Sequence, residues 1–161
     1  LDAVVKPYYS AIVTWLENIK CGMAGKEMYD LIEEALPKSQ YKWKLCPGHL
    51  VADEEWLTSP IYDGSNEVLK SGMMFQTDII PNVPGYGGSS VESTVCLADS
   101  ELREKIKNQQ PDLWKRIQAR RNYIINELNI NLSSAILPMC SIVAYLRPYF
   151  LDHSMAMKKL K

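Results

Sequence analysis

The sequence predicts an α+β fold, in which antiparallel strands from the middle of the chain are covered by the helices that flank them. Apolar residues recur at steps of three and four near both ends of the chain, which is typical of amphipathic helices. Between these regions, two apolar runs enclose a Gly- and Pro-rich stretch, which is typical of a hairpin. We find no repeat, linker or shift in composition, so residues 1–161 are predicted to form a single domain.

The first third of the chain predicts two helices, over residues 4–19 and 26–36, and Pro37 ends the second of them. Neither helix is apolar all round, so each needs a partner surface. The apolar stripe of the first helix contains Val5, Tyr8, Tyr9, Ile12, Leu16 and Ile19.

The middle of the chain predicts three strands. Alternating aromatic and basic residues favour a short strand over 41–45. Residues 73–80 and 91–98 form two more, and the simplest arrangement pairs them in antiparallel fashion around a turn at 82–88. Residues 52–67 are polar and aromatic, which is typical of a loop.

The remainder of the chain predicts helices. Asp99 or Ser100 can cap the first of these, and Pro111 suits the first position of the second. A further helical segment is predicted over 135–146, with Ser133 or Ser134 as its cap.

The charge balance argues against nucleic acid and membrane partners. Lys and Arg number 18 against 19 Asp and Glu, so the chain has no strong field that would attract polyanions. No apolar run is long enough to span a bilayer, and no secretory leader is recognisable. The four cysteines are widely spaced, which favours reduced thiols in a cytoplasmic protein.

Two carboxylates on the predicted hairpin form a candidate metal site. Asp78 and Glu92 each stand seven residues from Gly85, so a hairpin centred there places them opposite each other. Like charges at that distance repel, and a bound cation removes the conflict. If the turn is off-centre, each carboxylate is instead solvated, and the sequence leaves both interpretations open.

His49 is the candidate third ligand, and it follows Gly48, which allows a close approach of backbone. One imidazole with two carboxylates suits Mn, Fe, Co or Zn better than Ca or Mg. Taken alone, His49 is equally compatible with a hydrogen-bonded loop histidine.

Three aromatic residues in or beside the loops near these ligands are candidates for substrate binding, because aromatic side chains often line ligand sites. Packing within the loops is the alternative. These residues are Trp56, Tyr62 and Tyr86.

The order and spacing of several short motifs resemble the later half of the M24 metallopeptidases, the family of creatinase, prolidase and the Xaa-Pro and methionine aminopeptidases. The motifs are Gly48-His49, the run Gly72-Met73-Met74-Phe75-Gln76-Thr77-Asp78, and Val91-Glu92-Ser93-Thr94-Val95, preceded by two helices with Gly22 and Gly25 between them. The resemblance covers residues 1–100 and implies part of the family's pita-bread fold.

The resemblance also implies an activity and a ligand set. Members hydrolyse peptide bonds, here of the Xaa-Pro dipeptidase or aminopeptidase type, with water activated by two divalent metals that two Asp, one His and two Glu hold. His49 matches the histidine, Glu92 matches the last glutamate, and Asp78 stands where the family has the other glutamate. The implied metal is Mn, Co or Zn, and the implied substrate is a peptide.

The departures from the family pattern are specific. The family's two aspartates lie on a hairpin ahead of the first helix, where this sequence has only Asp2. Ser59-Pro60 replaces the family's second histidine, and Ser93 replaces the Asp that follows the last glutamate. At most three of five ligand positions are present, so the sequence predicts the C-terminal portion of a catalytic domain.

The incomplete ligand set leaves two alternatives for function. Either the chain alone is incomplete or inactive as a peptidase, or it is a non-catalytic peptide- or protein-binding module on the same fold. The missing half of the sheet would leave apolar faces uncovered, which predicts a homo-oligomer or association with an upstream segment.

Overall fold

A four-stranded antiparallel sheet with the strand order β1-β2-β3-β4 organises the molecule. The computed structural model describes residues 1–161 except 45, 52–57, 150 and 161. The predicted α+β class with an antiparallel sheet and flanking helices is confirmed. In chain order the elements are α1 (Val5–Asn18), α2 (Gly25–Ala35), α3 (Lys38–Tyr41), β1 (His49–Leu50), β2 (Met74–Gln76), β3 (Thr94–Leu97), α4 (Ser100–Gln109), α5 (Pro111–Asn126) and β4 (Ile136–Pro138).

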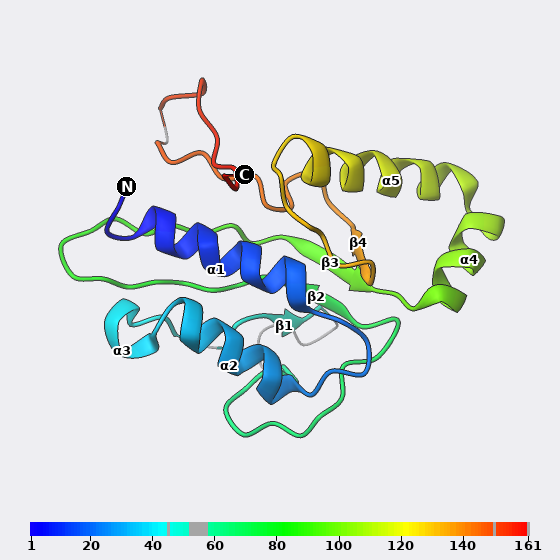
Figure 1. The fold of residues 1–161 in the computed structure, drawn as a ribbon, viewed down its shortest axis with the longest axis horizontal. Helices are drawn as coiled ribbons and strands as arrows, with labels where there is room; N and C mark the ends of the chain where they lie inside the picture. Colours follow the sequence, from blue (N-terminus) through cyan, green and yellow to red (C-terminus); the bar gives the residue numbers. More distant parts are fainter. Residues whose placement is uncertain (45, 52–57, 150, 161) are drawn as a thin grey trace.

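The register of the central hairpin is the one that the sequence predicted. β2 and β3 pair with Met74 opposite Cys96 and Gln76 opposite Thr94, which is symmetric about Gly85. The ladder is shorter than the predicted strands, and the chain continues beyond it as a long two-armed connection past the N-terminal end of α1 (Figure 1).

The two faces of the sheet are covered by different helices. Helices α1 and α2 pack together over one face, where Trp15 meets Phe75 edge to face with ring centroids 6.1 Å apart. Alternate residues of β3 point the other way, so Cys96 packs with Ile117 of α5 in a second, smaller apolar cluster. The sheet therefore separates a large core on the α1 side from a smaller one near α4 and α5.

The predicted strand over 41–45 is wrong for its described residues. Tyr41 ends α3, and Lys42 adopts a left-handed conformation with φ of 51°. Lys44 forms only an isolated bridge with Ile80. Tyr41 and Trp43 are both buried, and this burial produced the alternating pattern without a strand.

The predicted helix over 135–146 is also wrong, because β4 occupies its first part and turns follow. Pro138 explains the difference: it has no N–H to donate inside a helix, but an edge strand tolerates it where the nitrogen points away from the neighbouring strand. Leu137 pairs with Cys96, and Pro138 with Val95.

The outer edge of β4 is covered by two arginines of α5. Arg120 donates hydrogen bonds to the carbonyl oxygens of Pro138 and Met139, at 3.1 Å each. Arg121 donates to the carbonyl oxygens of Ser133, at 3.0 Å, and Ile136. Burial lowers the pKa of the Arg121 guanidinium.

Over the described part of the chain, none of the helices combines the length and the apolar character that crossing a bilayer demands.

Candidate metal centre

Three predicted ligands, His49, Asp78 and Glu92, lie together in the structure. Each offers one ligand atom, and these atoms all lie within 4.8 Å of one another. His49 begins β1, whereas Asp78 and Glu92 lie just beyond the ends of β2 and β3 that face the connection. The symmetric register of the hairpin places the two carboxylates opposite each other, as the spacing about Gly85 predicted.

The ring of His49 is oriented by a backbone acceptor. Its Nδ1 lies 2.9 Å from the carbonyl oxygen of Leu50, and a carbonyl can only accept, so Nδ1 carries the proton. Nε2 is the nitrogen that this hydrogen bond leaves available, and it lies 3.8 Å from Oδ2 of Asp78. A histidine held through one nitrogen and open at the other is the arrangement that metal-ligating histidines adopt.

Gly48 makes this placement of His49 possible. Its φ is +108°, in the left-handed region that favours glycine. A Cβ at Gly48 would lie 3.2 Å from Nε1 of Trp15 and 3.3 Å from the carbonyl oxygen of Gln76. The indole nitrogen of Trp15 also donates to the carbonyl oxygen of Pro47 at 2.9 Å, so α1 fixes the approach to His49.

The carboxylate of Asp78 is buried and only partly satisfied. Asp78 is 7% exposed, and its Oδ1 has no hydrogen-bond partner. Burial raises the pKa of this carboxyl, and the nearby His49 acts in the opposite direction. A bound cation would stabilise the ionised form and satisfy this oxygen.

Glu92 is the exposed member of the three. Thr77 holds the backbone on both sides of it: the Thr77 N–H donates to the carbonyl oxygen of Ser93 at 3.0 Å, and its Oγ1 donates to that of Val91 at 3.1 Å. The carboxylate therefore reaches the buried pair from the solvent side.

The donor set fits a divalent metal. Among the described residues, three buried side-chain oxygens lack a hydrogen-bond partner, and two of them belong to Gln76 and Asp78. These residues alternate on one face of the β2 strand and its extension, and Gln76 is paired with His49 across the sheet. One imidazole nitrogen with carboxylate oxygens is a set that Mn, Fe, Co and Zn accept.

Two of the three predicted substrate-binding aromatics are exposed, Tyr62 at 45% and Tyr86 at 58%. Trp56 lies outside the described residues. The role of all three in substrate binding stays a prediction.

The sequence analysis missed Tyr8, which it placed only in the apolar stripe of the first helix. The Tyr8 hydroxyl accepts a hydrogen bond from the N–H of Val91 at 2.5 Å, next to Glu92. Burial raises the pKa of this phenol to about 12. A tyrosine in an apolar stripe needs a partner for its hydroxyl, but the sequence does not reveal which one.

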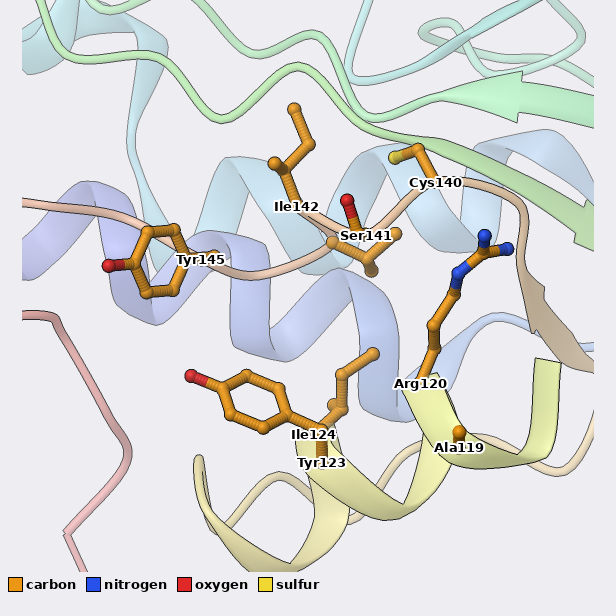
Figure 2. A pocket seen from close by; sticks show the side chains of 9 residues that line it. Ala119, Arg120, Tyr123, Ile124, Cys140, Ser141, Ile142 and Tyr145 are labelled. Carbon is orange, nitrogen blue, oxygen red and sulfur yellow. The ribbon is translucent and has the colours of Figure 1, made fainter. Parts of the chain in front are cut away.

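A separate pocket of about 480 Å³ lies between α5 and residues 140–145 (Figure 2). Tyr123, Ile124 and Ile142 line it, and the three candidate ligands do not. It is therefore a distinct feature of the surface and no part of the candidate metal centre.

The comparisons with known proteins concern part of the chain. No family model matches the sequence, and no curated protein does. Among solved structures, the chain is similar to a dipeptidase of Pyrococcus horikoshii, with 22% identity, a TM-score of 0.46, and coverage of 56% of this chain and 26% of that one. An Xaa-Pro dipeptidase of Bacillus anthracis gives 22% identity, a TM-score of 0.48, and coverage of 60% and 27%.

An X-Pro aminopeptidase of Thermotoga maritima gives 19% identity, a TM-score of 0.46, and coverage of 58% of this chain and 28% of that one. The chain spans about a quarter of the length of each of these three proteins. The chain is thus similar to a segment of two proteins that are named as dipeptidases and of one that is named as an aminopeptidase.

Proposed function

We propose that this chain carries part of the metal centre of an M24-type metallopeptidase domain, with His49, Asp78 and Glu92 as ligands of Mn, Co or Zn. The observation that carries the proposal is the convergence of these three side chains, whose ligand atoms lie within 4.8 Å of one another. The orientation of His49, whose Nδ1 faces the carbonyl oxygen of Leu50 and whose Nε2 faces Asp78, supports it.

Each of the three residues has a defined part in this proposal. His49 supplies a ring nitrogen whose orientation Leu50 fixes, Asp78 supplies a buried carboxylate, and Glu92 closes the site from solvent. A divalent cation held there would lower the pKa of water and polarise a carbonyl oxygen, which is the chemistry that peptide hydrolysis requires.

The substrate that the M24 resemblance implies is a peptide of the Xaa-Pro type, and Trp56, Tyr62 and Tyr86 are the aromatics proposed to contact it. These 161 residues match at most three of the family's five ligand positions, with Asp78 standing in for a glutamate. We therefore expect this chain alone to bind metal without hydrolysing peptides, and expect turnover to require the two aspartates that the family places ahead of the first helix.

Metal content tests the proposal. The purified chain is loaded with Mn²⁺ or Co²⁺ and desalted, and the retained metal is measured by elemental analysis. We expect near-stoichiometric metal in the wild type and a loss in Glu92→Gln. Glu34→Gln is the matched control, because Glu34 is an exposed glutamate of α2, and it should retain metal like the wild type. A wild-type chain that retains no metal contradicts the proposal.

The replacement of the family's Asp after the last glutamate by Ser93 favours a second candidate, a non-catalytic peptide-binding module on the same fold. This candidate predicts binding of Xaa-Pro peptides without turnover, and binding that survives His49→Ala. Calorimetric titration of the wild type and of His49→Ala with the same peptide separates the two, because a metal-dependent site loses the peptide with the histidine.

A further inference from the structure

The backbone that carries Glu92 lies outside the β ladder, which ends at Thr94. Among the described residues, four hydrogen bonds hold this segment, and Ser93 makes one of them, from its Oγ to the carbonyl oxygen of Ile142 at 3.3 Å. Thr77 makes two of them from the neighbouring strand extension, to the carbonyl oxygens of Val91 and Ser93. The fourth comes from α1, where the hydroxyl of Tyr8 accepts the N–H of Val91 at 2.5 Å.

Tyr8 is well suited to act as a fixed anchor. Its exposed fraction is 0%, it lies in the core between α1 and the sheet, and an aromatic ring has few rotamers to lose. Val91 is 4% exposed, so water could not easily replace the Tyr8 hydroxyl as the hydrogen-bond acceptor for its N–H. Tyr8 lies close enough to Asp78 and Glu92 for both charges to act on its hydroxyl.

The hydrogen bonds of Tyr8 and Thr77 meet on one residue. Tyr8 accepts the N–H of Val91, and Thr77 donates to the carbonyl oxygen of the same residue. That carbonyl belongs to the peptide group that joins Val91 to Glu92. The direction in which the Glu92 side chain leaves the backbone is therefore set by two elements, helix α1 and the extension of strand β2.

We propose that Tyr8 is a positioning residue of the candidate metal centre, which fixes Glu92 against His49 and Asp78 through its hydrogen bond to Val91. The part that concerns metal rests on the proposed function above. The part that concerns the backbone does not, because it follows from the hydrogen bond itself. Outer partners of this kind typically change metal affinity by about 10- to 100-fold when they are removed.

The test compares Tyr8→Phe with Tyr9→Phe. Both variants remove one buried phenol hydroxyl from the same helix and keep the ring, so both lose similar packing. The Tyr9 hydroxyl donates toward the carbonyl oxygens of Ala144 and Met157, at 3.1 Å each, away from Val91. Tyr9→Phe therefore controls for a general loss of stability.

Co²⁺ is the probe for the metal part, because its absorption spectrum reports the geometry of its ligands. We expect Tyr8→Phe to weaken Co²⁺ binding by about 10- to 100-fold and to change the d–d spectrum at saturating metal. Tyr9→Phe should match the wild type in both. Equal affinities and spectra for all three proteins, or equal losses in both variants, would overturn the positioning role.

Hydrogen exchange of the metal-free proteins tests the backbone part separately. Tyr8→Phe should speed exchange of the Val91 amide, whereas Tyr9→Phe should leave it as in the wild type. If the wild type binds no Co²⁺, the proposed metal centre fails while this result still decides whether Tyr8 holds Val91. An unchanged Val91 amide in Tyr8→Phe overturns the inference whatever the metal result.

Discussion

Nε2 of His49 lies 3.8 Å from Oδ2 of Asp78, and both residues are buried. The separation is longer than a hydrogen bond, so the two side chains face each other without a direct hydrogen bond between them. Two metal–ligand bonds of about 2 Å each can span such a gap. The buried pair destabilises the folded protein when no cation is bound, and it binds a cation when one is present. The first two predictions test this difference.

Asp78→Asn is expected to stabilise the metal-free protein while abolishing metal binding. Asparagine keeps a polar oxygen at this position but removes the buried charge, so the free energy of unfolding of the metal-free protein should rise. Urea unfolding in EDTA measures it. Glu92→Gln should also lose metal, but its exposed side chain should change stability by less than about 0.5 kcal/mol. A destabilised Asp78→Asn would contradict this account.

Metal is expected to raise the melting temperature, and EDTA should reverse the effect. At a free Co²⁺ concentration of 100 times Kd, binding to the folded state alone adds about 2.7 kcal/mol. His49→Ala should show no response, because it removes the oriented Nε2. Differential scanning calorimetry with and without Co²⁺ checks the prediction, and an equal response in His49→Ala would place the metal elsewhere.

Gly48→Ala is expected to destabilise the protein and to weaken metal binding. A left-handed conformation costs a residue with Cβ about 1–2 kcal/mol, and the added atom would press on Trp15. Gly87→Ala is the matched control, because a Cβ at Gly87 meets nothing within 4 Å and its φ is not in that region. Chemical denaturation and Co²⁺ titration of both variants should separate them, and equal behaviour would show that Gly48 does not position His49.

All four cysteines are free thiols, as the sequence predicted. Burial raises the pKa of the Cys46 and Cys96 thiols, so both stay protonated at neutral pH. Iodoacetamide should react slowly with them at pH 7.5 and faster as the pH rises beyond 9.

The folded state holds these two protons more tightly than the unfolded state does. The stability that they add is complete below the ordinary thiol pKa and is lost as the pH rises through the raised values. Mass spectrometry of pulse-labelled protein gives the rates, and urea unfolding against pH gives the stability. Fast native labelling of Cys96 at neutral pH would contradict its burial.

Self-association stays a prediction from the sequence. Several large apolar side chains are exposed, among them Ile142 at 51% and Leu151 at 87%. Exposed apolar surface of this kind favours association. Light scattering at micromolar concentration should give a mass above that of one chain, and a clean monomer would end the prediction.

The sequence predicted the register of the central hairpin, but it did not predict the structure of residues 41–44 or 136–138. The alternation within β2 and β3 and the turn residues around Gly85 set the register, and the register places Asp78 opposite Glu92. The position of His49 could not be predicted from a local pattern, because it depends on packing between Trp15 and the residues that precede His49. The sequence offered His49 as the third ligand by its residue type and by its place after Gly48, and the resemblance to known motifs supported that choice.

The errors have local causes. Tyr41 and Trp43 are both buried, but they are buried around a left-handed turn at Lys42, so the alternation indicated burial and not a strand. Residues 136–138 carry apolar side chains that suit either a helix or a strand, and Pro138 together with the pairing with β3 decides between them. Tyr8 was missed because its hydrogen-bond partner is distant in the sequence.

Arg120 and Arg121 block the addition of a further strand to the sheet beside β4. Their guanidinium groups bind the outward carbonyl oxygens along that edge, so these oxygens are not available to accept hydrogen bonds from a new strand. Any extra strand, from another segment or another copy, would have to displace α5 before it could add there. Growth on this side is thus coupled to movement of a helix, which protects the free chain against edge-to-edge aggregation.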